Sequence, residues 1–236
     1  MSAFDLSGKL AVVTGGSAGI GAGIVAALAE AGAKVVNVDL AGSADVRIDL
    51  GSEESIVKGC AEIVAKYGAP WALVNNAGIQ DRQLLLDGTA EEWDRMNRVN
   101  ARGPFLMTRE LGRAMVAGKL GGRIVNIASC SLEGQMVKGL AAYMGSKGAL
   151  AALTQASALE LVEHNITVNT ILPGGVATPG AINAKGPVPE GPARRRPPLG
   201  MCEPRDIGAA VLFFVSPAAR YVTNQTLTVD AGFSIT

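Results

Sequence analysis

The chain has 236 residues, of which 48% are apolar and only 4% aromatic, so its core must be built largely from Ala, Val, Leu and Ile. That length is compatible with a single large α/β domain. The 21 basic and 21 acidic residues cancel, which leaves no global field to attract nucleic acid or an anionic membrane.

The N-terminal sequence and the apolar pattern predict a cytoplasmic protein. The opening "MSAFDLSGKL" lacks the basic region and apolar core of a signal peptide. The apolar runs fall far short of the roughly 18 residues that a membrane span needs. Cys60, Cys130 and Cys202 are odd in number and widely spaced, which suits reduced thiols, and with a single histidine the chain predicts no metal site.

Short β-branched runs alternate along the chain with helical patterns. Such alternation is typical of a parallel sheet covered by helices on both faces. We therefore predict an α/β fold in which residues 1–236 form a single Rossmann-type domain with a doubly wound parallel sheet of about seven strands. The expected strands are 9–14, 34–39, 45–49, 71–76, 123–129, 166–172 and 226–230.

A glycine-rich loop, "TGGSAGIG" (14–21), follows the first expected strand and opens a helical stretch. Gly15, Gly19 and Gly21 permit a tight turn, close approach of the backbone to a pyrophosphate, and tight packing of helix on strand. The second strand ends in Asp39, where a dinucleotide-binding unit places an acid against the adenosine ribose. A bare strand-to-helix turn is the alternative, but the combination favours a dinucleotide site.

Asp39 also predicts which dinucleotide is bound. A carboxylate that accepts hydrogen bonds from the ribose hydroxyls would repel a 2′-phosphate. No Lys or Arg stands in the glycine loop or in the "LAGS" that follows Asp39. We therefore expect NAD(H) as the cofactor rather than NADP(H).

The stretch "YMGSK" brings two reactive side chains to one helical face. In a helix over 142–162, Tyr143 and Lys147 are neighbours, because they are four residues apart. An ammonium beside a phenol favours the phenolate and lowers its pKa from the usual value of about 10. Tyr143 is then a candidate acid and base for an alcohol or carbonyl oxygen, although a surface pair on a helix would show the same spacing.

Several motifs, taken in order, resemble those of the short-chain dehydrogenase/reductase family from about residue 5 to the C-terminus. They are "TGGSAGIG", "NNAG" (75–78), "RVNARGPF" (98–105), "RIVNIAS" (123–129), "YMGSK" (143–147), "ILPGGVATP" (171–179) and "VDAG" (229–232). The resemblance implies that Tyr143 is the general acid and base. It implies that Lys147 lowers the pKa of the tyrosine and holds the nicotinamide ribose, and that Asn100 anchors a water of a proton relay.

The resemblance also implies a set of residues around the dinucleotide. Asn76 would steady the central strand beside the cofactor, and Asp49 and Leu50 would border the adenine. The carboxamide end would be held by residues after the sixth strand. The full expected set is Gly15, Ser17, Gly19, Ile20, Gly21, Asp39, Asp49, Leu50, Asn76, Ala77, Gly78, Tyr143, Lys147, Pro173, Gly174, Val176 and Thr178.

The serine that polarises the carbonyl has more than one candidate. In the family it usually precedes the tyrosine by 13 residues, a position that Cys130 holds here. A thiol is a poor donor for this role, and alignment of the preceding strand from its start leads to Ser129. We favour Ser129 over Ser131, for which the alternative is a loop hydroxyl that caps a turn.

Substrate choice in such folds comes from loops beyond the carboxyl ends of the strands. The expected loops are 78–85, 130–140 and a Pro- and Gly-rich stretch, 178–200, which is either a lid or poorly ordered. Polar and apolar side chains are mixed there, so the sequence does not choose between an alcohol, a hydroxy acid and a sugar-derived substrate. The candidate contacts are Gln80, Arg82, Ser131, Gln135 and Met136.

A second copy of the chain is an expected partner. The helix over 142–162 is small and apolar around most of its circumference, and a sheet can bury only one side of it. The family resemblance likewise points to a homodimer or homotetramer built through this helix and the one at about 100–118.

These inferences predict an NAD(H)-dependent enzyme that transfers a hydride between nicotinamide and a small-molecule secondary alcohol or ketone. The expected catalytic set is Asn100, Ser129, Tyr143 and Lys147. Two alternatives remain. One is a 3-oxoacyl-carrier-protein-type reductase, and the other is a dinucleotide sensor without turnover.

Overall fold

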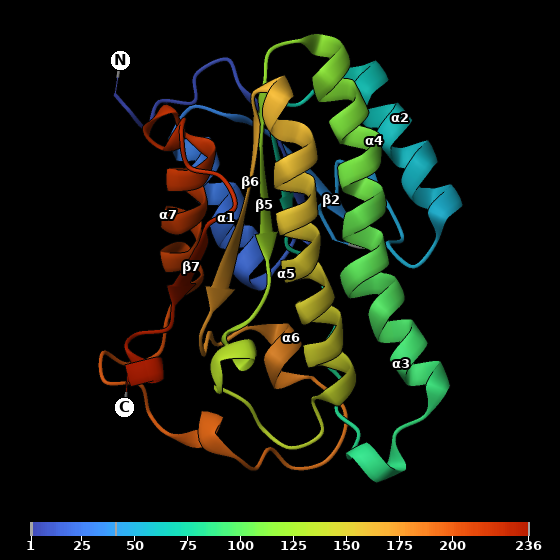
Figure 1. The fold of residues 1–236 in the computed structure, drawn as a ribbon, viewed down its shortest axis with the longest axis vertical. Helices are drawn as coiled ribbons and strands as arrows, with labels where there is room; N and C mark the ends of the chain where they lie inside the picture. Colours follow the sequence, from blue (N-terminus) through green and yellow to red (C-terminus); the bar gives the residue numbers. More distant parts are fainter. Residues whose placement is uncertain (1, 41, 236) are drawn as a thin grey trace.

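The structure is a computed structural model that describes residues 2–40 and 42–235 (Figure 1). Its strands form one parallel sheet in the order β3-β2-β1-β4-β5-β6-β7. The predicted doubly wound α/β fold with seven strands is confirmed. The strands are β1 (Leu10–Thr14), β2 (Lys34–Asp39), β3 (Val46–Arg47), β4 (Ala72–Asn75), β5 (Gly122–Ile127), β6 (Ile166–Pro173) and β7 (Thr226–Val229).

One expected strand is much shorter than predicted. Residues 45–49 contribute only the two residues of β3, at the edge of the sheet. Its partner β2 ends at Asp39. The chain turns shortly after β3, where the Ser52 amide donates to the Asp49 carbonyl at 3.0 Å. An edge strand needs a partner to continue, so β3 stops where β2 stops.

Helices cover both faces of the sheet (Figure 1). Neighbouring residues of a strand point to opposite faces, and in β1 Val12 joins one hydrophobic core while Ala11 and Val13 join the other. The side chains of Ala11 and Val13 pack under α1 (Gly19–Glu30) and α7 (Pro204–Val215). Val12 packs under the three helices of the other face, α2 (Glu53–Tyr67), α4 (Gly103–Gly118) and α5 (Ala141–Leu161).

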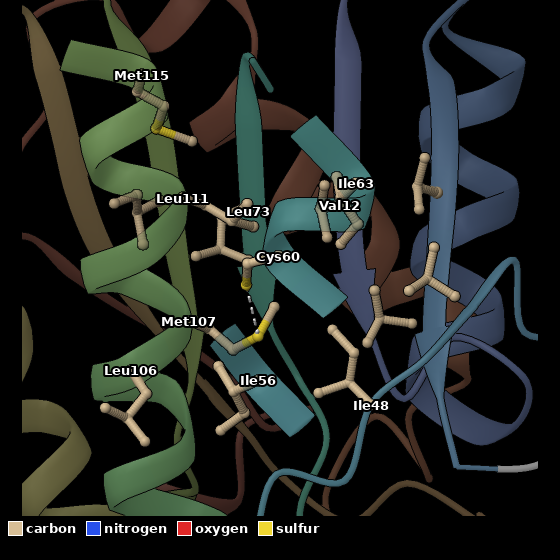
Figure 2. Close-up of a cluster of buried hydrophobic side chains, with 14 of the residues drawn as sticks. Val12, Ile48, Ile56, Cys60, Ile63, Leu73, Leu106, Met107, Leu111 and Met115 are labelled. Carbon is tan, nitrogen blue, oxygen red and sulfur yellow. Dashed lines mark hydrogen bonds between the residues drawn. The ribbon is translucent and has the colours of Figure 1, made fainter. Parts of the chain in front are cut away.

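The core under α2 and α4 is closely packed and contains two sulfur atoms (Figure 2). The Cys60 thiol of α2 lies 3.6 Å from the sulfur of Met107 on α4, and both side chains are buried. Burial raises the pKa of Cys60 to about 12, so this thiol stays neutral and contributes as an apolar packing residue.

The helix expected at about 100–118 is preceded by a wider turn. Residues 90–97 form α3 (Ala90–Asn97), and Arg98–Arg102 form a π-helical turn before α4 begins at Gly103. Such turns occur often at functional sites. Asn100 lies in this turn and is fully buried.

The segment 178–200 follows a defined path along the carboxyl edge of the sheet. It contains the short helix α6 (Pro179–Ile182) and a 3-10 turn at Pro192–Arg194. Backbone hydrogen bonds tie it to two other loops, from Arg82 N to Lys185 O, from Lys138 N to Glu190 O, and from Ala193 N to Met136 O. No helix in the described part of the chain is long and apolar enough to span a membrane.

Candidate active site

A cavity of about 730 Å³ opens at the carboxyl edge of the sheet, where the strand order reverses between β1 and β4. Ligands of open α/β sheets bind at such a reversal point. The loop after β1, the end of β2 and the loop after β4 line one part of the cavity. Residues that follow β5 and β6, the start of α5 and part of the segment 178–200 line the rest.

The glycine loop takes the shape that the sequence predicts. Gly15 and Gly19 have φ angles of 68° and 53°, in the left-handed region that favours glycine. At Gly21 a side chain would collide with the carbonyl oxygen of Gly15. Asn76 holds the loop from the neighbouring strand, because its Nδ2 donates to Thr14 O at 2.9 Å and to Gly15 O at 3.3 Å.

Asp39 stands at the end of β2 and lines the same cavity. Its Oδ1 accepts from the amide of Leu40 at 2.7 Å, and its Oδ2 accepts from the amide of Ser17 at 3.2 Å. The Ser17 hydroxyl in turn accepts from Asn37 Nδ2 at 3.0 Å. The carboxylate is therefore held in place beside the glycine loop by backbone amides and a supporting amide side chain.

The other expected dinucleotide residues gather around this cavity with one exception. Ser17 is not among the residues that line the cavity, and its backbone amide donates to the Asp39 carboxylate. Those that do line it are Gly15, Gly19, Ile20, Gly21, Asp39, Asp49, Leu50, Asn76, Ala77, Gly78, Tyr143, Lys147, Pro173, Gly174, Val176 and Thr178. Three features of the cavity fit a dinucleotide. The glycines leave room for its phosphates, the start of α1 presents backbone amides, and Asp39 stands at the end of β2.

Tyr143 and Lys147 lie near the start of α5, and both side chains are buried. Lys147 Nζ donates to the carbonyl of Ile127 at 2.8 Å and lies 5.8 Å from the centre of the Tyr143 ring. Asn100, in the π-helical turn, and Lys147 both lie next to Gly78. A Cβ atom added at Gly78 would be 3.1 Å from Asn100 Oδ1 and 3.3 Å from Lys147 Nζ. Asn100 is fixed by hydrogen bonds of 2.9 Å to both the amide and the carbonyl of Ile79.

The pKa shifts in this group differ from the expectation that Lys147 lowers the pKa of the phenol. Burial raises the pKa of Tyr143, and a hydrogen bond with Ser129 offsets part of that rise. Burial also lowers the pKa of Lys147 from 10.5 to about 8. The physical reason is that both groups lose water on burial, while the Lys147 ammonium donates to the Ile127 carbonyl.

The three candidates around the carbonyl-polarising position have different surroundings. Ser129 lines the cavity and pairs with Tyr143. Cys130 turns away, because its Sγ contacts Gln135 Oε1 at 3.0 Å and the carbonyl of Pro173 at 3.1 Å. Ser131 lines the cavity, but its hydroxyl has no hydrogen-bond partner within residues 2–40 and 42–235. Only the Ser129 hydroxyl is thus paired with the phenol.

Two of the candidate substrate contacts lie outside the cavity. Met136 is not among the lining residues, nor is Arg82, whose guanidinium donates to the carbonyls of Pro187 at 3.1 Å and Ala184 at 3.2 Å. Arg82 therefore holds the segment 178–200 instead of facing a substrate. The prediction for Arg82 was wrong because its partners are more than 100 residues away, beyond the reach of a local pattern.

The cavity also contains an ion pair that the sequence analysis missed. Arg95 of α3 contacts both Asp81 and Glu92 at 2.6 Å, and Arg95 and Asp81 line the cavity with Gln80 and Gln135. The i, i+3 spacing of Glu92 and Arg95 is visible in the sequence, whereas no local signal connects Arg95 to Asp81. The Arg95 charge is thus compensated within the protein.

Comparison with known proteins shows what the chain as a whole is similar to. A family model described as Enoyl-(Acyl carrier protein) reductase matches residues 15–234. The NAD-dependent glycerol dehydrogenase of Listeria innocua is 34% identical, over 98% of this chain and 96% of that protein. A short-chain type dehydrogenase/reductase from Mycobacterium marinum has a TM-score of 0.86 at 32% identity, covering 98% of this chain and 97% of that one. The 3-ketoacyl-(acyl-carrier-protein) reductase from Brucella melitensis complexed with NADH has a TM-score of 0.88 at 32% identity, covering 98% and 100%.

Proposed function

Because the chain belongs to the short-chain dehydrogenase/reductase family, we propose that it is an NAD(H)-dependent oxidoreductase acting on a secondary alcohol and its ketone. The observation that carries this proposal is the meeting of Ser129, Tyr143 and Lys147 in the cavity that also contains the glycine loop and Asp39. A group that can exchange a proton thus shares one space with a cradle for a dinucleotide.

In the proposed mechanism the nicotinamide, when bound, supplies the chemistry of hydride exchange at its C4 atom. During oxidation the proton of the Tyr143 phenol must first pass to Lys147, and the resulting phenolate takes the proton of the substrate hydroxyl. During reduction the Tyr143 phenol gives its proton to the carbonyl oxygen. The Ser129 hydroxyl donates to the same substrate oxygen and stabilises the charge that develops there. Lys147 exchanges protons with Tyr143. Asn100 holds the backbone of Ile79 in place near the Lys147 ammonium through its two hydrogen bonds to that residue.

Asp39 supports a preference for NAD(H) over NADP(H), since a 2′-phosphate would meet a fixed carboxylate. We expect Asp39→Ala to lower the ratio of kcat/KM with NAD to that with NADP by about tenfold or more, because the repulsion of a like charge is removed. Initial rates with both cofactors measure this ratio. Asp45→Asn is the matched control, since Asp45 receives the amide of Asn37 and does not line the cavity. Wild-type protein that prefers NADP would contradict the role of Asp39.

Assembly into a homodimer or homotetramer through α4 and α5 is also proposed. Phe105 on α4 is 46% exposed, Leu159 on α5 is 79% exposed, and Val162 just beyond α5 is 50% exposed. Apolar side chains in such positions are typical of an interface. Light scattering at micromolar concentration is expected to show a dimer or tetramer, and Leu159→Arg to shift it towards the monomer. A wild-type monomer would refute the proposal.

A 3-oxoacyl-carrier-protein-type reductase is the second candidate, and the similarity to the Brucella structure supports it. Asp39 weighs against it if such a reductase uses NADPH. The formal net charge of zero also weighs against it, because it gives no overall attraction to an acidic carrier. Reduction of an acetoacetyl thioester at a rate well above that of simple ketones would favour this candidate. A sensor without turnover is disfavoured by the presence of Ser129, Tyr143 and Lys147 together.

A further inference from the structure

Asp81 joins the loop after β4 to the segment 178–200 at the substrate end of the cavity. Its Oδ1 accepts from the backbone amide of Lys185 at 2.8 Å, and its Oδ2 accepts from Arg95 Nη2 at 2.6 Å. Burial alone would raise the pKa of this carboxyl, but the hydrogen bonds from Lys185 and Arg95 lower the pKa below its usual value, so Asp81 is charged at neutral pH. Both of its oxygen atoms are therefore engaged by the protein.

Arg82 binds the same stretch of the segment with its backbone and with its side chain. Its amide donates to the carbonyl of Lys185 at 2.8 Å, and its guanidinium donates to the carbonyls of Ala184 and Pro187. Gly186 makes this closeness possible, because a side chain added there would collide with the carbonyl oxygen of Arg82. The φ angle of Gly186, 114°, likewise favours glycine. Residues 81–82 and 184–187 are thus held against each other along their backbones.

Arg95 ties this contact to a helix. Glu92, one turn earlier on α3, accepts from Arg95 Nε at 2.8 Å and from Arg95 Nη2 at 2.6 Å. A guanidinium that is bound in this bidentate way is fixed in direction as well as in position. The connection runs from α3 through Arg95 to Asp81, and from Asp81 to the amide of Lys185.

The contact borders the part of the cavity where a substrate must lie. Asp81 lines the cavity from one side of the contact, and Ala184 lines it from the other. Gly78, three residues before Asp81, lies next to the Lys147 ammonium, and three residues of chain span at most roughly 11 Å. The position of the segment 178–200 therefore sets one wall of the space beside the proposed proton-transfer group.

We propose that residues 81–82 and Gly186 form a latch that holds the segment 178–200 over the substrate. Asp81 is thereby a positioning residue for the alcohol. The latched form binds the alcohol and the open form does not, so the latch acts on KM and leaves the chemical step unchanged. This inference rests on the proposed function, because it assigns the alcohol to the cavity beside Tyr143.

Digestion with trypsin measures how often the latch opens. The exposed Lys185 is a trypsin site whose backbone the latch holds, and cleavage there requires the segment to open locally. We expect Asp81→Ala to speed cleavage after Lys185 by about tenfold or more, since the loss of a hydrogen bond to a charged group changes an equilibrium by about that factor. Asp81→Asn, which keeps an acceptor for the Lys185 amide but loses the charge, should give a smaller increase. The masses of the fragments distinguish this site from the arginines at 194–196.

Glu190→Gln is the matched control on the same segment. Glu190 pairs with Lys138 at 3.0 Å, but the two side chains are 60% and 68% exposed, and such exposed pairs contribute little. Cleavage after Lys185 should therefore be unchanged in this variant. An equal rise in Asp81→Ala and Glu190→Gln would reveal a general loosening of the segment and would overturn the latch.

The effect on the substrate is measured as a split between KM and kcat for NAD-dependent oxidation. The alcohol is whichever of 2-butanol, glycerol and sorbitol the wild type oxidises fastest. KM rises strongly only when the open form becomes the main form, so the variant is the double substitution Asp81→Ala/Arg82→Ala. We expect its KM for the alcohol to rise about threefold or more, with kcat within about twofold of the wild-type value.

Gly186→Ala separates the latch from the charge of Asp81. It removes no charge from the cavity, yet the added side chain would force the two stretches of backbone apart. A higher KM and faster cleavage after Lys185 in this variant as well would support the latch. A higher KM in the Asp81 variants alone would mean that Asp81 contacts the alcohol directly, and the positioning role would be overturned.

The outcomes also separate this inference from the proposed function. Unchanged cleavage after Lys185 in Asp81→Ala would overturn the latch while leaving the oxidoreductase proposal intact. Absence of wild-type turnover on all three alcohols would count against the proposed function and against the positioning of an alcohol by Asp81. The rates of cleavage by trypsin would then still decide whether the latch exists.

Discussion

Tyr143→Phe is expected to lower kcat for alcohol oxidation by about 10²- to 10⁴-fold, the range that a positioned acid or base contributes. The substitution removes only the phenol oxygen, and the buried ring keeps its contacts beside Met96 and Leu140. Dinucleotide binding should therefore change far less than turnover. Nicotinamide absorbance measures the rate, and the fluorescence of bound NADH measures the affinity.

Tyr67→Phe is the matched control for this variant, because Tyr67 ends α2 and does not line the cavity. Turnover retained in Tyr143→Phe would refute the acid and base role of the phenol. Wild-type protein that binds NADH but oxidises none of a panel of secondary alcohols, polyols and hydroxy acids would favour the sensor alternative.

Lys147→Met is expected to lower activity by about 10²-fold or more and at the same time to stabilise the fold at neutral pH. The pKa of Lys147 is about 8 in the folded protein against 10.5 for a free lysine, a difference of about 3 kcal/mol at 1.36 kcal/mol per pKa unit. Methionine removes this desolvation cost but also the hydrogen bond to Ile127, worth about 1 kcal/mol. A net gain on the order of 2 kcal/mol at pH 7 follows.

The pH dependence of stability provides the check on this second variant. Because its pKa is lowered on folding, Lys147 binds fewer protons in the folded than in the unfolded protein between pH 8 and 10.5. The free energy of unfolding of the wild type should therefore rise with pH across this window, relative to Lys147→Met. Urea unfolding at several pH values measures the difference. Lys58→Met, which alters an exposed lysine of α2, is the control, and equal pH slopes in wild type and Lys147→Met would contradict the argument.

The fold and the meeting of the glycine loop, Asp39 and the Tyr143–Lys147 pair at one cavity could be predicted because their signals are local. Periodic apolar residues defined β2 at 34–39 to the residue, and the positions of Gly15 and Gly21 follow from backbone constraints that any strand-to-helix turn around a phosphate shares. The prediction that Tyr143 and Lys147 are neighbours on one helical face was likewise possible, because their four-residue spacing requires only that the segment be helical. These residues meet in one cavity as the spacing requires.

The substrate end resisted prediction because its contacts are distant in the sequence. Arg82 donates to the carbonyls of Ala184 and Pro187 and does not line the cavity. Arg95 of α3 pairs with Asp81 in the loop after β4. The direction of the Tyr143 pKa shift was also missed, since spacing reports proximity to a charge but not the loss of water. Counting could not separate Ser129 from Ser131, whereas their different partners can.

Hydrogen bonds join the three loops around the substrate end of the cavity, so an attempt to alter substrate preference should exchange these loops together. The loop after β4, the loop after β5 and the segment 178–200 are joined to one another through Arg82, through Gln83 N to Gly139 O, and through Lys138 N to Glu190 O. A chimaera that receives one of these loops from a relative would break main-chain bonds to the other two. Exchange of all three as a cassette would keep those bonds, and it would leave the fully buried side chains of the two hydrophobic cores on either face of the sheet unchanged.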